Sequence, residues 1–315
     1  MRNGHEGGNE QNEPLRIGMI GLDNSRVLAF AKLLNDERQP EPLKSASLVA
    51  AWQGAASADF AMSATRIDNY REALKNEHGV RMMDSLEEVA AVCDAWMLEA
   101  VDGRVHEELF ARMVPYRKPI FVDKPFALDS KAAERMIRLA WEYETPFMSC
   151  SALRYMESLV VAMAETEPDA IAGADFHGPM PLEPTQPGYF WYGIHMAEML
   201  FKAMGAGCEE VRAVRTSEHD VAIGVWRDGR IGTIRGYRSG NEAFGGKLHL
   251  SRGSSGSLSV HEGGKPFLAA MMEDVVQFFR SGRTPIDPAE TLAIIRFLEA
   301  ANDSIRLNQA IKLKA

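Results

Sequence analysis

The sequence has little of what disulfide-rich, membrane-spanning and nucleic-acid-binding proteins need. It contains three cysteines, Cys93, Cys150 and Cys208, which are too few and too scattered for a disulfide framework or a zinc knuckle. It has no apolar run of about eighteen residues, so we expect no membrane span. Acidic residues outnumber basic ones by 44 to 35, and the net charge of −9 argues against binding to nucleic acid or to an anionic membrane.

The amino-terminal residues are polar and glycine-rich. They lack the apolar segment of a signal peptide, so we expect a disordered tail over 1–14 and a cytoplasmic location. The length of 315 residues exceeds one typical core and predicts two domains.

The first half of the chain alternates apolar strands with amphipathic helices. We expect helices starting at Asn24 or Ser25, near 87 and 105, and at Asp129 or Ser130. Expected strands cover 15–21, 47–52, 94–99, 119–123 and 146–150. This alternation predicts parallel βαβ units in a doubly wound α/β Rossmann domain over 15–152.

The second half is richer in strands. Asp228-Gly229 is a strong hairpin signal between two of them. Expected strands cover 170–177, 210–217, 221–227, 230–237, 247–251 and 257–260, and expected helices cover 157–165, 190–204, 268–281 and 288–307. We therefore expect an α+β domain over 153–315 with a large open, mainly antiparallel sheet.

A glycine turn joins the first strand to the first helix, as in dinucleotide-binding folds. A G-x-G-x-x-G fingerprint from Gly21 would need glycine at position 23 and glycine or alanine at 26, but the chain has Asp23 and Arg26. A carboxylate there adds bulk and repels phosphate, which predicts weak or displaced cofactor binding or a different ligand, with Arg26 as a compensating phosphate contact. Alternatively, Asp23 is a plain cap-region acid and Arg26 is solvated. The candidate cofactor-binding residues are Gly18, Gly21, Asp23, Asn24, Ser25 and Arg26.

The ends of the next strands supply further candidates. The second strand ends in Trp52-Gln53-Gly54, without the acid that binds a ribose or the arginine that binds a 2′-phosphate, so NAD and NADP are not distinguished. We include Gln53, and Glu99 at the end of the fourth strand, among the cofactor-binding candidates.

Lys124 follows the strand Pro119–Asp123 and precedes Pro125. It is therefore expected at the carboxyl end of a strand, where open α/β sheets bind ligands, on a turn that proline fixes. The plain alternative is a surface lysine after a strand.

These features together resemble the Gfo/Idh/MocA family, the glucose–fructose oxidoreductase and inositol dehydrogenase group. The resemblance rests on short motifs in a consistent order: Ile17 to Gly21, the loop Val101 to His106, Asp123-Lys124-Pro125 in place of Glu-Lys-Pro, Gly193-Ile194-His195 as the family's Gly-x-His, and closing helices over 271–313. It spans nearly the whole chain from residue 15.

The resemblance implies NAD(P)-dependent oxidation or reduction of a sugar, polyol or related carbonyl compound. It implies that Lys124 contacts nicotinamide and substrate and that His195 is the acid/base; it also implies a homodimer or homotetramer. Imidazole titrates near working pH, and a nearby ammonium would stabilise a developing alkoxide. The family often has an aspartate four residues before the histidine; this chain has Trp191, and Glu198, one helical turn later, is the predicted replacement that orients the imidazole.

Other candidate substrate ligands have structural alternatives. The cluster Tyr189 to Tyr192 is either a sugar-stacking wall or core packing. The acids Glu99 and Asp102, with His106, either bind polar groups or cap the following helix. Arg154 and Tyr155, at the domain boundary, either reach substrate or act as struts. The substrate-binding candidates are Asp102, His106, Arg154, Tyr155, Tyr192, His195 and Glu198; no metal is expected, because His177, His195 and Glu198 lack a convincing ligand spacing.

The sequence thus predicts an oxidoreductase that uses NAD or NADP and a small hydroxylated or carbonyl substrate. The alternative is a protein of the same fold without redox chemistry, either a sugar-binding or regulatory protein or a lyase or hydrolase. The altered glycine fingerprint and the missing aspartate favour that alternative, whereas Lys124 and His195 favour an enzyme.

Overall fold

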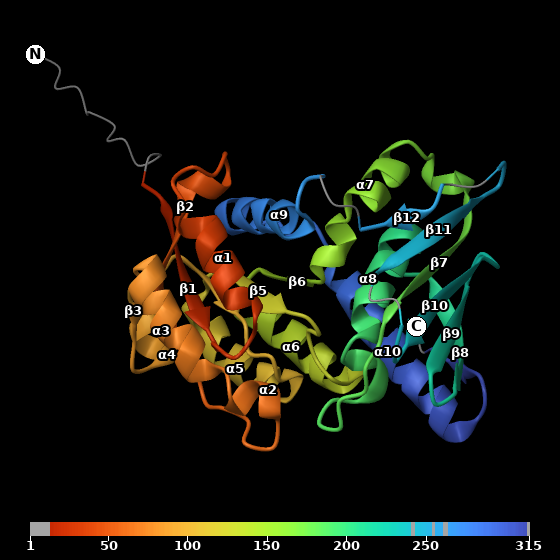
Figure 1. Ribbon diagram of the computed structural model, residues 1–315, viewed down its shortest axis with the longest axis horizontal. Coiled ribbons are helices and arrows are strands. Elements are labelled where there is room, and N and C mark those ends of the chain that lie inside the picture. Colours follow the sequence, from red (N-terminus) through yellow and green to blue (C-terminus); the bar gives the residue numbers. More distant parts are fainter. Residues whose placement is uncertain (1–12, 241–242, 254–255, 261–263, 314–315) are drawn as a thin grey trace, which may run out of the picture.

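The computed structural model describes residues 13–240, 243–253, 256–260 and 264–313. Most of the predicted tail, residues 1–12, lies outside this range. The described chain forms two sheets side by side, each covered by helices (Figure 1).

The first sheet has six parallel strands in the order β3-β2-β1-β4-β5-β6. Its strands are β1 (Leu15–Ile20), β2 (Ala46–Trp52), β3 (Arg81–Met82), β4 (Ala95–Leu98), β5 (Ile120–Asp123) and β6 (Phe147–Cys150). Strands β4, β5 and β6 are buried along their full length, as expected for strands covered on both faces. The sheet reverses direction of growth between β1 and β4, so the crevice at their carboxyl ends is the place where such folds bind ligands. The predicted doubly wound sheet is confirmed.

The helices around this sheet are α1 (Arg26–Asn35), α2 (Ala61–Ala64), α3 (Ile67–His78), α4 (Leu86–Ala90), α5 (His106–Met113) and α6 (Ser130–Glu142). Helix α1 buries Val27, Phe30, Ala31 and Leu34, the apolar stripe visible in the sequence. Asp129 caps α6 by accepting a hydrogen bond from the backbone of Ala132. Helices α2 and α3 and the two-residue edge strand β3 were not predicted from the sequence.

The second sheet has seven strands in the order β12-β11-β7-β10-β9-β8-β13. They are β7 (Ile171–Pro179), β8 (Cys208–Arg215), β9 (His219–Trp226), β10 (Ile231–Tyr237), β11 (Gly245–Leu250), β12 (Leu258–Ser259) and β13 (Ile311–Lys312). All neighbours are antiparallel except β7 and β10. The predicted β9–β10 hairpin forms, with Gly229 at φ 86° in its turn. The predicted mainly antiparallel sheet is thus also confirmed.

The remaining helices connect the two sheets. They are α7 (Glu157–Ala164), α8 (Gly193–Met204), α9 (Phe267–Ser281) and α10 (Pro288–Leu307). Helices α8 and α10 pack on the second sheet, whereas α9 returns to lie beside α1 on the first (Figure 1). A division of the chain at residue 152 therefore remains a proposal, because α9 comes late in the sequence but shares the first core. Among the described residues, no helix is long and apolar enough to cross a bilayer.

Candidate active site

A cavity of about 720 Å³ lies where the two sheets meet. The first sheet contributes the loop from Asn24 to Arg26, Val101 after β4, Lys124 after β5 and Ser151 after β6. The second half contributes mainly aromatic residues, together with His195 on the first turn of α8. The remaining lining residues are Met62, Arg66, Ala152, Leu153, Trp191, Tyr192, Ala243, Phe244, Val260, Phe267 and Leu268. The carboxyl ends of the parallel strands thus face α8 across one hollow, which brings Asn24, Ser25, Arg26, Lys124, Tyr192 and His195 together as the sequence predicted.

Lys124 is 6% exposed, and its ammonium lies 5.2 Å from the ring centroid of Trp191 and 6.0 Å from that of Tyr192. No hydrogen bond or ion pair joins Nζ to any described residue. Burial, followed by the positive charge of Arg26, lowers the pKa of Lys124 to about 8. The side chain therefore presents an ammonium near neutral pH whose charge is held mainly by aromatic faces.

His195 is held by Ser151, a contact that sequence reasoning missed. Ser151 Oγ lies 2.6 Å from His195 Nδ1 and also accepts a hydrogen bond from the backbone of Leu153. Burial, and then the charges of Lys124 and Arg26, lower the pKa of His195 well below its usual 6.5. The imidazole is therefore neutral at pH 7, and Nε2 can accept a proton when Nδ1 donates its hydrogen to Ser151.

Removing the Ser151 hydroxyl tests this positioning role. We expect Ser151→Ala to lower kcat by about 2- to 10-fold, the value of one hydrogen bond, with a smaller effect on KM. Ser158→Ala, which removes a hydroxyl that bonds Ser259 away from the cavity, is the matched control. A larger loss in Ser158→Ala than in Ser151→Ala would contradict the assignment.

A polar network fills the base of the crevice between β1 and β4. The amide of Asn24 donates to Asp123 Oδ2 at 2.7 Å, and Arg26 pairs with the same oxygen at 2.5 Å. Glu99 is fully buried; its Oε2 lies 3.5 Å from the Asn24 amide and its Oε1 has no hydrogen-bond partner among the described residues. Burial, and then the charge of Asp123, raise the pKa of Glu99 well above its usual value, so this environment favours the protonated carboxyl group.

Asp23 connects this crevice to the segment between β2 and α3, residues 53–66, which we call the β2–α3 segment. Its carboxylate accepts hydrogen bonds from the backbone of Val101 at 2.8 Å and from Ser63 Oγ at 2.5 Å. Burial raises the pKa of Asp23, although both hydrogen bonds oppose that shift. The segment also packs Phe60 edge-on against Trp191, with ring centroids 5.4 Å apart. Asp23 is therefore not the plain helix cap considered from the sequence: it fastens this segment to the loop after β4.

Gly18, His106 and Asp102 are among the predicted site residues that lie away from the cavity walls. Gly18 faces the opposite side of β1, where an added Cβ would lie 2.4 Å from Val89 of α4, so its place is explained by packing. Both ring nitrogens of His106 face carbonyl oxygens, of Pro125 and Ala100, at 2.9 and 2.8 Å. Asp102 bonds Gln186 of the second half at 2.8 Å. His106 thus joins the loops after β4 and β5, and Asp102 ties the two halves together.

The predicted contact between Glu198 and His195 is replaced by an ion pair. Glu198 accepts from Arg154 at 3.1 Å, and Arg154 also pairs with Glu290 at 2.7 Å. The imidazole of His195 is instead bonded by Ser151. Arg154 is a buried strut, and the ring centroid of Tyr155 lies 5.2 Å from the ammonium of Lys202.

Gln53 lines a separate pocket of about 130 Å³ at the ends of β1, β2 and β4. Gly21 and Gly54, with φ of 86° and 71°, leave room there beside Trp52, and the guanidinium of Arg112 lies 5.4 Å from the Trp52 ring centroid. Asp23 lines this pocket too, while its neighbours Asn24 to Arg26 line the larger cavity. The two hollows therefore flank the loop after β1.

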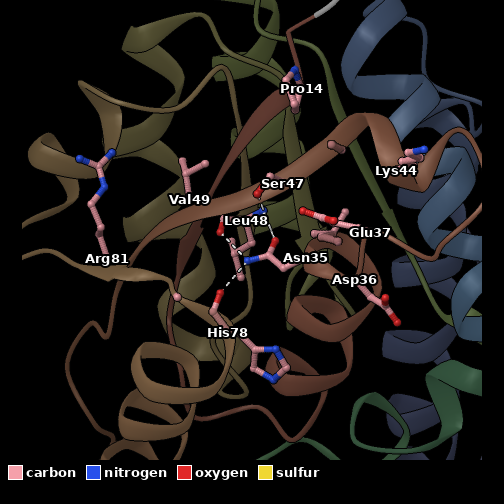
Figure 2. A pocket seen from close by; sticks show the side chains of 13 residues that line it. Pro14, Asn35, Asp36, Glu37, Lys44, Ser47, Leu48, Val49, His78 and Arg81 are labelled. Carbon is pink, nitrogen blue, oxygen red and sulfur yellow. Dashed lines mark hydrogen bonds between the residues drawn. The ribbon is translucent and has the colours of Figure 1, made fainter.

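Another hollow, of about 780 Å³, lies at the opposite edge of the first sheet, around the amino end of β2. Figure 2 shows Asn35 in its centre, with its amide donating to the backbone carbonyls of Leu48 and His78. The amide oxygen accepts from Leu48 N and Ser47 Oγ, so the Asn35 amide holds α1 to β2 and to the end of α3. Because open α/β sheets bind ligands at the carboxyl ends of their strands, we assign no chemistry to this hollow.

Comparison with known proteins identifies the fold. The model of an oxidoreductase family with an NAD-binding Rossmann fold matches residues 15–149. Myo-inositol 2-dehydrogenase from Lactobacillus plantarum is 18% identical, with a TM-score of 0.76 over 96% of this chain and 100% of that one. Scyllo-inositol dehydrogenase from Lactobacillus casei, solved with NAD(H) and scyllo-inositol, is 13% identical, with a TM-score of 0.76 over 95% of this chain and 99% of that one. At these identities the two structures show a shared fold. No curated protein sequence gives a significant match.

Proposed function

We propose that this chain, a member of the Gfo/Idh/MocA oxidoreductase family through its residues 15–149, transfers a hydride between NAD or NADP and a small hydroxylated or carbonyl substrate held between Lys124 and His195. One observation carries the proposal. A buried ammonium and a neutral imidazole, from opposite halves of the molecule, line the same cavity at the carboxyl ends of the parallel strands.

The residues at both ends of the crevice fit a dinucleotide. The pocket beside Trp52, which Gly21 and Gly54 also line, suits a flat base, while the cavity between the two sheets has room for a nicotinamide and a substrate. Ser25 and Arg26, between the two, would hold the diphosphate. When bound, the dinucleotide supplies the hydride acceptor or donor.

The residues of the chain would handle the proton and the charge. In the oxidation direction, His195 Nε2 accepts the proton of the substrate hydroxyl, and Ser151 keeps the ring in place. The Lys124 ammonium stabilises the negative charge that develops on the same oxygen. Trp191 and Tyr192 keep water away from Lys124 and offer flat apolar faces to a sugar or polyol ring. The buried residues Tyr189 and Phe190 belong to the core instead.

Calorimetric titration of the purified protein with NAD⁺, NADH, NADP⁺ and NADPH is the direct test. Micromolar binding of one of them would support the proposal, identify the cofactor and justify a polyol and sugar screen that follows absorbance at the nicotinamide band. No binding at millimolar concentrations would contradict it.

A specific observation favours the second candidate, a protein of this fold without redox chemistry. Asp23 already occupies the Val101 N–H and brings a carboxylate close to the loop that would hold the diphosphate. In that case the cavity would bind a sugar for regulation, or would support lyase or hydrolase chemistry. The same titration decides between the candidates, because only the first requires a nicotinamide dinucleotide.

Asp23 variants separate its charge from its bulk. We expect Asp23→Asn to tighten NAD(P)H binding by about 10-fold or more, because it removes a negative charge near the diphosphate while keeping the size of the side chain. Asp23→Gly should tighten binding at least as much, and it also releases Ser63. Calorimetry on both variants measures the effect, and unchanged affinities in both would refute phosphate repulsion as the role of Asp23.

A further inference from the structure

The charged side chains on the walls of the cavity between the two sheets all carry a positive charge. Its charged lining residues, among those the structure describes, are Arg26, Arg66 and Lys124, and none is acidic. This is notable in a chain whose net charge is −9. Clefts lined by one sign of charge concentrate ligands of the opposite sign.

Arg66 is the basic residue without a counter-ion. It occupies the position before the first residue of α3, at the end of the β2–α3 segment. No hydrogen bond or ion pair joins its guanidinium to any other described residue. Arg26, by contrast, is bound to Asp123 and Asn24. A guanidinium beside a cavity offers a fork of N–H donors that matches a phosphate or carboxylate group.

Three backbone donors beside this cavity, those of Arg26, Val27 and Val101, are already in use. The N–H of Arg26 donates to Asn24 Oδ1 at 3.1 Å, and that of Val27 donates to the Asn24 carbonyl at 3.2 Å. The Val101 N–H donates to Asp23. In dinucleotide-binding folds the N–H groups at the start of the first helix bind the phosphates. Here the N–H groups of Arg26 and Val27 are used within the loop, so a basic side chain would replace part of the donors that the backbone offers in those folds.

We propose that Arg66, assisted by Arg26, forms an anion-binding subsite on the wall of this cavity, for a phosphate or carboxylate group. The inference rests on the proposed function in treating the cavity as the active site. The anionic group belongs either to the diphosphate of the cofactor or to the substrate; in the second case the substrate is an acid or a phosphate ester, not a neutral polyol.

Titration with inorganic pyrophosphate tests the subsite independently of any reaction. We expect the wild-type protein to bind pyrophosphate, Arg66→Gln to weaken that binding by about 10- to 100-fold, and Arg66→Lys to keep part of it. Arg71 is an exposed arginine on α3 that does not line the cavity, so Arg71→Gln is the matched control and should bind like the wild type. Circular dichroism melting verifies that each variant is folded. Equal pyrophosphate affinity in wild type and Arg66→Gln, or no binding by the wild type, would overturn the proposal.

Two further arms identify the source of the anion. Weaker binding of NADH to Arg66→Gln assigns the subsite to the cofactor. Unchanged NADH affinity, with loss of glucuronate binding to the protein saturated with NADH, assigns it to the substrate. If no dinucleotide binds but pyrophosphate binding depends on Arg66, the proposed oxidoreductase function fails while the subsite stands.

Discussion

Replacement of Lys124 by methionine is expected to lower kcat/KM by about 10²- to 10⁴-fold, the range for loss of a preorganised group that stabilises charge in the transition state. Methionine keeps the length and apolar contacts of the side chain, so its packing against Trp191 and Tyr192 is retained. What is lost is an ammonium that lies beside His195 in the same cavity. Steady-state kinetics with the cofactor identified by titration measures the effect.

Lys131→Met is the control for this prediction, because Lys131 is exposed on α6 and does not line the cavity. It should leave kcat/KM unchanged. Full activity in Lys124→Met would remove Lys124 from the reaction centre, whatever the affinity for the cofactor.

The pH dependence of activity offers a second signature of Lys124. Its pKa is lowered to about 8, mainly by burial, so the ammonium is present below that pH and is lost as the pH rises through it. Activity that needs the charge therefore declines above about pH 8. In Lys124→Arg the side chain stays charged, so the residual activity of this variant should lack the alkaline decline. An identical decline in both proteins would assign it to another group.

The sequence predicted the position of those site residues that directly follow a strand of the parallel sheet. Lys124 comes directly after an apolar strand and before proline, which was enough to place it at the ligand-binding edge of the sheet. His195 was identified by family resemblance, and the structure places it on the same cavity. Helix α3 was not predicted because only two of its described residues, Ile67 and Leu74, are buried. Two apolar positions seven residues apart do not make a readable stripe.

The contacts within the site depended on distances in space that sequence spacing does not encode. Helical spacing put Glu198 on the same face as His195, but it says nothing about the competing guanidinium of Arg154, which arrives from the linker between the sheets. Ser151, the observed partner of His195, is 44 residues away along the chain and has no motif of its own. Similarly, Asp23 was visible as a departure from a glycine pattern, whereas its bonds to Val101 and Ser63 required the folded loops.

Replacement of His195 by glutamine is expected to lower kcat by about 10²- to 10⁴-fold while the Kd for the dinucleotide stays the same, since glutamine can still accept a hydrogen bond but is not a base. His195 lies on α8, outside the first sheet, which explains why cofactor binding should be preserved. In the wild type, the low pKa of His195 keeps the imidazole unprotonated down to a pH below 6.5, so the acidic decline of activity should lie below that value.

The role of His195 is tested against a histidine that cannot reach the cavity. His219, exposed on β9, provides that comparison, and His219→Gln should match the wild type in kcat and in its acidic limb. If His195→Gln keeps the wild-type kcat, another group accepts the proton. Among the described residues that line the cavity, Lys124 is then the remaining group whose pKa is lowered toward neutrality. In that case the pH profile near pH 8 would be reversed. Activity would rise as the pH increases through about 8, because Lys124 would have to lose its proton before acting as the base. The direction of the pH profile near pH 8 therefore distinguishes a histidine base assisted by an ammonium from a lysine base.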